Sequence, residues 1–200
     1  DEAFLRQGWR AMLEKEDFIH GIYEAEDKDE FIKHVTGQAI DIILLDIRLR
    51  KTSGLELLQQ LSELEHPPKV IAVTGLDGVE LIINLLKSGV NGIVYKLDGY
   101  GEIIKAINTV RHSGMYFPQN ILRIIQSNAK RWDSTPPIVL SFQEKELLKA
   151  IANGGTTKEI AVDLKMTSST AETYRIRLMK KVGVSNTAAL LAYAFRNGIL

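Results

Sequence analysis

The first half of the chain alternates between two spacings of apolar residues. Short apolar runs, continuous or with every second residue apolar, are typical of β-strands. They occur at 18–24, 41–46, 69–74 and 92–96. Segments with apolar residues every three or four positions are typical of helices, and they occur at 3–15, 28–37, 54–64, 78–89 and 102–113. Strands that alternate with helices in this way predict an α/β fold, a parallel sheet with helices on both faces.

The second half has a helical spacing only. Ser141 and Glu144 have the spacing of a capping box, which marks the start of a helix that ends near residues 153–155. Three further helices are expected within 156–166, 167–183 and 185–198, with Ser168 capping the second of these three. The tight turn at 165–168 joins two of them as a helix-turn-helix requires.

A composition shift separates the two halves. Residues 118–130 predict one more helix, and the Asp, Ser, Thr and Pro of 131–139 are typical of a linker. Residues 1–120 carry 13 Lys/Arg and 19 Asp/Glu, whereas residues 138–200 carry 9 and 5. We therefore predict an acidic domain at 1–116, a connecting segment at 117–138, and a basic domain at 139–200 that binds a polyanion.

The overall composition excludes several classes of protein. Hydrophobic residues make up 45% and charged residues 25% of the 200 residues, which is ordinary for a globular domain. No apolar run is long enough for a membrane helix, and no membrane partner is expected. The absence of cysteine excludes disulfides and Cys-based zinc sites, and the four histidines lack the spacing of metal ligands. We expect a cytoplasmic protein.

Three polar residues follow the ends of successive predicted strands, namely Asp46, Thr74 and Lys96. The carboxyl ends of parallel strands meet at one edge of the sheet, where ligands bind in such folds. An aspartate can accept a phosphoryl group when a divalent cation, an ammonium and a hydroxyl lie beside it. Asp41, by contrast, only begins its strand.

The same stretches resemble a known family. "DIILLDIRLRKTSGLELLQQL", "VIAVTG" and "SGVNGIVYK" resemble the receiver domain of two-component response regulators, and "LSFQEKELLKAIANGGTTKEIA" and "KKVGVSNTAALLAYAFRNGIL" resemble the LuxR-type DNA-binding domain. The whole chain is similar to NarL/FixJ-type regulators. The resemblance implies a flavodoxin-like receiver followed by a four-helix helix-turn-helix domain. It also implies a transcriptional regulator that a histidine kinase phosphorylates. The protein would not be an enzyme, except in catalysing its own phosphorylation and dephosphorylation.

The resemblance also assigns roles to individual residues. Asp46 matches the phosphoacceptor, Thr74 the switch hydroxyl and Lys96 the phosphate-binding lysine. Mg²⁺ is the implied cofactor, with Asp1, Asp46 and the backbone carbonyl of Arg48 as its ligands.

The chain departs from the family pattern at four places. It begins at Asp1, without the family's first strand and first acidic residue, which suggests a trimmed sequence. Arg50 and Leu97 replace residues that are often proline, and Ile93 replaces an aromatic residue that often acts in the switch. These departures leave open an alternative, a phosphorylation-independent regulator whose receiver-like domain serves dimerisation or ligand binding. A hydrolase of the haloacid dehalogenase kind is disfavoured because Arg48 stands where its acid would be.

The third helix of the basic half is the predicted DNA-reading helix. At 100° per residue, one side gathers Ala171, Tyr174, Leu178 and Val182, as a core requires. The expected groove contacts are Ser169, Glu172, Thr173, Ile176 and Lys180, with Glu172 able to accept from cytosine N4. The expected phosphate contacts are Arg175, Arg177 and Lys181. The net charge of residues 138–200 is +4, which is modest for a DNA-binding domain. We therefore expect a homodimer on double-stranded DNA, because two copies double the number of phosphate contacts.

Overall fold

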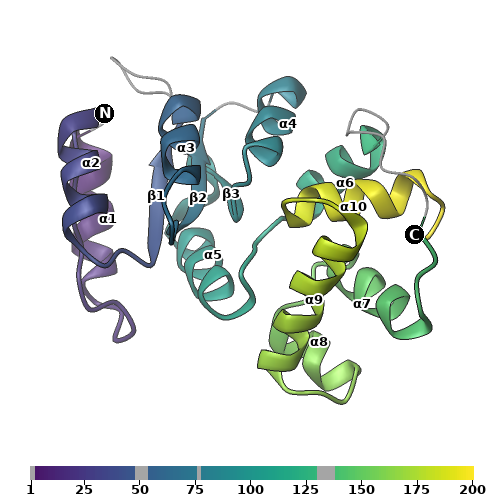
Figure 1. The fold of residues 1–200 in the computed structure, drawn as a ribbon. Helices are drawn as coiled ribbons and strands as arrows, with labels where there is room; N and C mark the ends of the chain where they lie inside the picture. The colour runs from purple at the N-terminus through teal and green to yellow at the C-terminus, as the bar shows by residue number, and fades with distance from the viewer. Residues whose placement is uncertain (1–2, 48–53, 76–77, 130–137) are drawn as a thin grey trace.

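Three parallel strands form the centre of the N-terminal half (Figure 1). In this computed structural model they are β1 (Ile42–Asp46), β2 (Lys69–Thr74) and β3 (Gly92–Tyr95), paired in the order β1-β2-β3. The structure describes residues 3–47, 54–75, 78–129 and 138–200. Three of the four predicted strands and the parallel sheet are thereby confirmed.

Helices cover both faces of this sheet, because its side chains alternate between two apolar clusters. Ile71 and Val94 pack with residues of α1 (Ala3–Leu13) and α5 (Gly99–Ser113). Ala72 and Ile93 belong to the other cluster. That cluster also contains residues of α2 (Lys28–Gly37), α3 (Gly54–Ser62) and α4 (Val79–Lys87). The predicted two-sided α/β arrangement is confirmed.

The strand predicted at 18–24 is wrong: this segment is neither strand nor helix. Within the described residues β1 pairs only with β2, so nothing offers 18–24 a ladder of hydrogen bonds. Ion pairs attach the segment to α1 instead, since Glu24 lies 3.0 Å from Arg6 and 2.9 Å from Arg10. Its apolar alternation therefore serves packing against α1 and α5 rather than pairing.

Four helices form the C-terminal half, namely α7 (Phe142–Ala152), α8 (Thr157–Asp163), α9 (Ser168–Val182) and α10 (Thr187–Arg196). Ser141 and Glu144 form the predicted capping box, and Thr156 and Glu159 form a second one. The cap of α9 is Thr167 rather than Ser168. Between α8 and α9 the backbone turns at Lys165, whose φ is 54°. This is the predicted helix-turn-helix.

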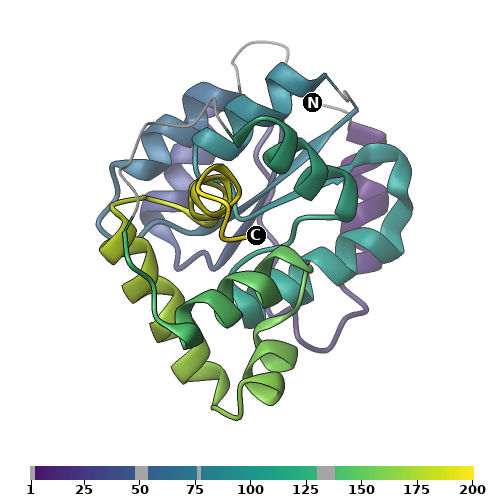
Figure 2. The same ribbon diagram turned by 90° about the vertical axis from the view of Figure 1, so that its right-hand side faces the viewer.

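The two halves share one apolar core. The predicted helix after Pro118 is α6 (Gln119–Ser127), which packs against both α4 and α10. Figures 1 and 2 show α10 beside α6 and α4, and α8 and α9 below them near α5. A single cluster of buried side chains extends from Leu45 in β1 to Leu190 and Leu191 in α10. Separating the halves would therefore expose apolar surface, which costs free energy.

None of the helices in the described parts of the chain combines the length and the apolar character that crossing a membrane requires.

Candidate functional site

The carboxyl edge of the sheet brings together two of the residues that the strand pattern singled out. Asp46 ends β1, Thr74 ends β2, and Lys96 follows β3 as the first residue of a short 3-10 helix, η1 (Lys96–Asp98). Lys96 Nζ donates a hydrogen bond to Asp46 Oδ2 at 2.8 Å. An acid and an amine 50 positions apart in sequence thus meet because parallel strands end at the same edge.

The surroundings of this contact are partly desolvated. The side chains of Asp46 and Lys96 are only 19% and 15% exposed, and Thr74 is buried. The aliphatic part of Lys96 passes over Gly75, where a Cβ would lie 3.8 Å from Lys96 Cδ. Because an ion pair is stronger where water is scarce, the ammonium is held in place beside the carboxylate. The arrangement presents an oriented nucleophilic oxygen next to a fixed positive charge.

A magnesium ion fits the chemistry of this edge. Mg²⁺ takes one or two carboxylates, and it completes its octahedron with phosphate, backbone oxygen and water. Asp46 supplies one carboxylate there, and the other predicted ligands, Asp1 and the carbonyl of Arg48, lie outside the described residues. Within the described residues, no group of three or more His, Asp or Glu is placed to hold a metal by itself. Among the described residues, Asp46 is the predicted ligand that a metal at this edge would use.

Two of the departures noted in the sequence can be located. Ile93 is fully buried and packs in the apolar cluster that contains residues of α4. Leu97 lies in η1 with its side chain almost completely in solvent. Arg50 lies outside the described residues.

The second candidate surface is the outer face of α9. Ala171, Leu178 and Val182 are buried, as the helical spacing predicts. The opposite face is exposed and carries Ser169, Thr173, Ile176, Arg177 and Lys180. This face offers hydroxyls, one large apolar side chain and two cations to a partner.

Glu172 and Arg175 lie on the flank of α9 rather than on its outer face. Arg175 Nε and Nη2 donate to the two carboxylate oxygens of Glu172, and its Nη1 donates to Thr187 Oγ1 at 2.6 Å. The Arg175 side chain is only 12% exposed. The helical pattern predicts Glu172 in the groove and Arg175 at phosphates, whereas in this conformation they bind each other. Their spacing of three residues on a helix is a signal for such a pair.

This flank rests on the N-terminal half. Gly114 ends α5 with φ 75°, and a Cβ there would lie 2.5 Å from Arg175 Nη2 and 3.3 Å from Glu172 Oε1. Sequence reasoning missed this contact, because nothing in the local sequence relates α5 to α9. It joins the predicted DNA-reading helix directly to the domain that carries Asp46.

Lys181 is also held within the protein. Its Nζ donates to both carboxylate oxygens of Glu144, at 2.9 and 2.8 Å. Burial raises the pKa of Glu144, but the hydrogen bonds from Lys181 and from the backbone of Ser141 outweigh burial and lower it. Lys181 therefore ties α9 to the start of α7, and Arg177 and Lys180 are the cations that the outer face presents.

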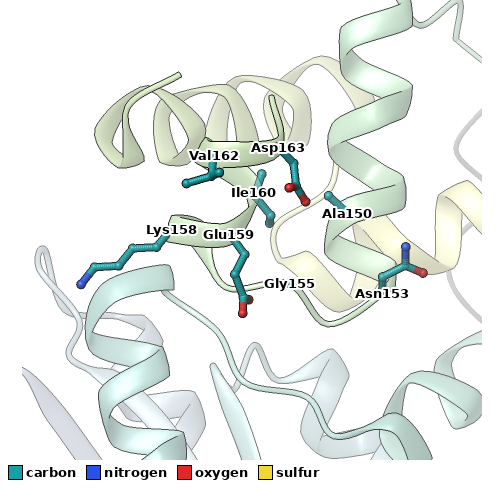
Figure 3. A pocket seen from close by; sticks show the side chains of 8 residues that line it. All are labelled: Ala150, Asn153, Gly155, Lys158, Glu159, Ile160, Val162 and Asp163. Atoms are coloured by element: carbon teal, nitrogen blue, oxygen red, sulfur yellow. The ribbon is translucent and has the colours of Figure 1, made fainter. Parts of the chain in front are cut away.

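A shallow hollow of about 480 Å³ lies between the end of α7 and α8 (Figure 3). Its lining includes Ala150, Asn153 and three charged side chains of α8, namely Lys158, Glu159 and Asp163. It is remote from Asp46 and contains neither of the two candidate surfaces. We assign it no function.

Comparison with known proteins agrees with both domains. Residues 1–108 match the family described as response regulator receiver domain, and residues 138–194 match the bacterial regulatory proteins of the luxR family. The transcription regulator BvgA of Bordetella pertussis is 32% identical over 201 residues, which cover all of this chain and 95% of BvgA. Fimbriae Z protein of Escherichia coli is 24% identical over 190 residues, covering 95% of this chain and 90% of that protein.

Solved structures show the same fold. RcsB of Salmonella typhimurium superimposes with a TM-score of 0.58 at 22% identity, covering 96% of this chain and 94% of RcsB. An RcsB–DNA complex gives a TM-score of 0.58 at 23% identity, over 96% and 93% of the two chains. This chain belongs to the response regulators of the NarL/FixJ type, transcriptional regulators in which a receiver domain precedes a LuxR-type helix-turn-helix domain.

Proposed function

We propose that a partner histidine kinase phosphorylates Asp46 in a Mg²⁺-dependent reaction, and that this controls the binding of double-stranded DNA by α9. The observation that carries the proposal is the 2.8 Å contact between Lys96 Nζ and Asp46 Oδ2 at the carboxyl edge of the sheet. Asp41, which precedes the opposite end of the same strand, is exposed, and its carboxylate forms no such ion pair with the described residues. The proposal gives the protein no catalytic role beyond its own phosphorylation and dephosphorylation.

The transfer needs an oriented carboxylate and a positive environment. A carboxylate oxygen of Asp46 attacks the phosphorus of phosphohistidine, the P–N bond breaks, and the imidazole leaves and takes up a proton. Asp46 then carries an acyl phosphate, whose oxygens the Lys96 ammonium can bind in place of the free carboxylate. When bound by Asp46, Asp1 and the carbonyl of Arg48, Mg²⁺ would neutralise charge that develops on the phosphoryl oxygens.

The proposed signal passes from Asp46 to the DNA-binding domain through Thr74 and α4. Thr74 ends β2, and the chain continues through residues 75–78 into α4. When the Thr74 hydroxyl moves toward the phosphoryl group, the start of α4 is pulled with it. Since α4 packs against α6 and α10, any displacement of α4 changes the surface on which the DNA-binding domain rests.

The present conformation is a closed one. The Glu172–Arg175 flank of α9 lies against Gly114, and the buried residues of α10 share a core with α4. A DNA backbone that follows α9 would meet the receiver on this side. Release of the domain would free this flank and let two copies pair on DNA, which doubles the number of phosphate contacts that a net charge of +4 supplies. RcsB, which has the same fold, has been solved as dimers bound to DNA.

Labelling with acetyl phosphate tests the acceptor. The full chain is incubated with ³²P-acetyl phosphate and Mg²⁺, and incorporation is compared for the wild type, Asp46→Ala and Asp41→Ala. The proposal expects labelling of the wild type and of Asp41→Ala, and none of Asp46→Ala or without Mg²⁺. Undiminished labelling of Asp46→Ala would refute the assignment.

A second function is favoured by one observation. Because Ile93 is buried and aliphatic, the usual aromatic partner of the Thr74 switch is missing. A receiver that serves dimerisation or ligand binding without phosphorylation would tolerate this replacement. DNA affinity distinguishes this second function from phosphorylation control, because under the second function a phosphoryl mimic would not change the affinity.

A further inference from the structure

The outer face of α9 carries one large apolar side chain in the middle of polar neighbours. Ile176 is 52% exposed, whereas Leu178 and Val182 of the same helix are buried. Ile176 is absent from the apolar clusters that hold the fold together. The fold therefore does not require an isoleucine at this position.

The neighbours of Ile176 define the chemistry around it. Thr173 lies one turn before it on the same face, and Arg177 and Lys180 lie beside it and one turn after it. The Thr173 hydroxyl donates to the carbonyl of Ser169 at 2.9 Å, so its proton is used within the helix. Without breaking that bond, Thr173 can offer a partner its γ-methyl group and the acceptor lone pairs of its hydroxyl oxygen. Ile176 is thus the large apolar side chain of this face, with cations at its border.

One group in the major groove matches this side chain. The base edges present hydrogen-bond donors and acceptors, and the C5-methyl of thymine is the apolar exception. An isoleucine placed over a donor or acceptor would remove water from it without replacing the hydrogen bond. Against a thymine methyl group, the same side chain displaces only water around apolar surface. Release of that water is favourable.

We infer that Ile176 is a specificity-determining residue that selects a thymine in each half-site by burying its side chain against the C5-methyl group. This inference rests on the proposed function, in which the outer face of α9 enters the major groove. Thr173 would border the same contact, and Arg177 and Lys180 would reach the flanking phosphates.

The test begins with the sequences that the protein selects. Duplexes are enriched from a random pool by the full-length chain, with and without Mg²⁺ and beryllofluoride, and the enriched duplex becomes the probe. Each thymine is then replaced in turn by deoxyuridine, which removes the methyl group and nothing else. At fixed salt, one position per half-site should weaken wild-type binding about fourfold, as expected for one buried methyl group.

Protein variants test whether Ile176 is the residue that contacts this methyl group. Ile176→Ala should bind the thymine probe more weakly and should no longer distinguish thymine from deoxyuridine at that position, whereas Ile176→Val should retain most of the distinction. Val162→Ala is the matched control, because Val162 is an exposed aliphatic residue on α8 of the same domain. It should bind and discriminate as the wild type does.

Two results would overturn the inference. If Ile176→Ala keeps the wild-type affinity, or the same deoxyuridine sensitivity at every position, Ile176 does not read a methyl group, although the proposed function stands. If neither condition enriches any duplex, the inference fails together with the proposed function.

Discussion

Arg175 of α9 lies against Gly114, at the point where α5 ends. A Cβ at Gly114 would lie 2.5 Å from the Nη2 atom of Arg175, closer than a Cβ can approach a nitrogen. Gly114 also has φ 75°, in the left-handed region that disfavours other residues. Two independent conditions thus favour glycine at this contact, one from the turn and one from the Arg175 side chain, which would have to shift to make room for a Cβ.

Gly114→Ala should therefore weaken the contact between α9 and the end of α5. The left-handed backbone alone costs about 1–2 kcal/mol, and the clash with Arg175 adds to it. We expect lower stability in urea unfolding, and DNA binding by the unphosphorylated chain that is several times tighter than that of the wild type.

Gly89→Ala is the control for that variant. Gly89 has φ 84°, and a Cβ added to it would meet no described atom within 4 Å, so it carries the same backbone strain without a clash. It should lose stability and keep the wild-type DNA affinity. Equal DNA affinities for the two alanine variants would show that the Gly114 contact does not restrain α9.

The salt dependence of DNA binding should distinguish Arg177 and Lys180, which would contact DNA phosphates, from Lys181, which forms an ion pair within the protein. Arg177→Gln and Lys180→Gln should each reduce the slope of log K against log salt by about 0.9 per protomer. Lys181→Gln should lower stability but leave the slope unchanged, because Lys181 binds Glu144. A slope that falls equally in all three variants would place Lys181 on the DNA.

Acid should weaken the DNA-binding domain through Glu144. Its pKa is lowered below the ordinary 4.5, since the bonds from Lys181 and Ser141 outweigh burial. A carboxylate with a depressed folded pKa stabilises the fold above the unfolded pKa, and that stabilisation is lost as the pH falls through the folded value. Urea unfolding at pH 7 and at steps below 4.5 should show a decline that Glu144→Gln reduces.

Glu146→Gln provides the comparison, because Glu146 lies on the same helix and forms an ion pair with Lys149, three residues further along it. The wild-type pH profile should persist in that variant. The same profile in Glu144→Gln would mean that another group causes the acid sensitivity.

Tyr193 is a buried tyrosine of α10 whose hydroxyl can be removed without removing the ring. Tyr193 of α10 is 1% exposed, and its hydroxyl accepts a hydrogen bond from the backbone N–H of Ile138 at 2.6 Å. Tyr193→Phe keeps the ring and takes away this acceptor, so it should cost about 1–3 kcal/mol in urea unfolding. Tyr174→Phe, on the half-buried flank of α9, should cost less, and equal losses would argue against a role for the Ile138 bond.

The sequence predicts the parts of this molecule that depend on local spacing. The three strands, the capping box at Ser141, and the meeting of Asp46 with Lys96 all follow from spacing and from the geometry of parallel strands. The prediction fails at 18–24, because apolar alternation describes a strand only if a neighbouring strand completes its ladder.

The contacts between distant segments are the other part that spacing does not predict. Glu144 and Lys181 are 37 residues apart, and Gly114 follows α5 whereas Arg175 belongs to α9. Such contacts depend on how complete helices pack, so they become visible only in the folded chain. They change the interpretation of α9, since the charged side chains of Glu172, Arg175 and Lys181 form ion pairs within the protein.

The most direct test of phosphorylation control is the response of DNA binding to a phosphoryl mimic. Affinity for the selected duplex and the mass of the free chain are measured with Mg²⁺, with and without beryllofluoride, for the wild type and for Asp46→Ala. Control through Asp46 predicts that beryllofluoride tightens wild-type binding about tenfold or more and produces a dimer, as a coupling of about 1–3 kcal/mol allows, and that Asp46→Ala does not respond. Unchanged affinity and mass in the wild type would contradict it.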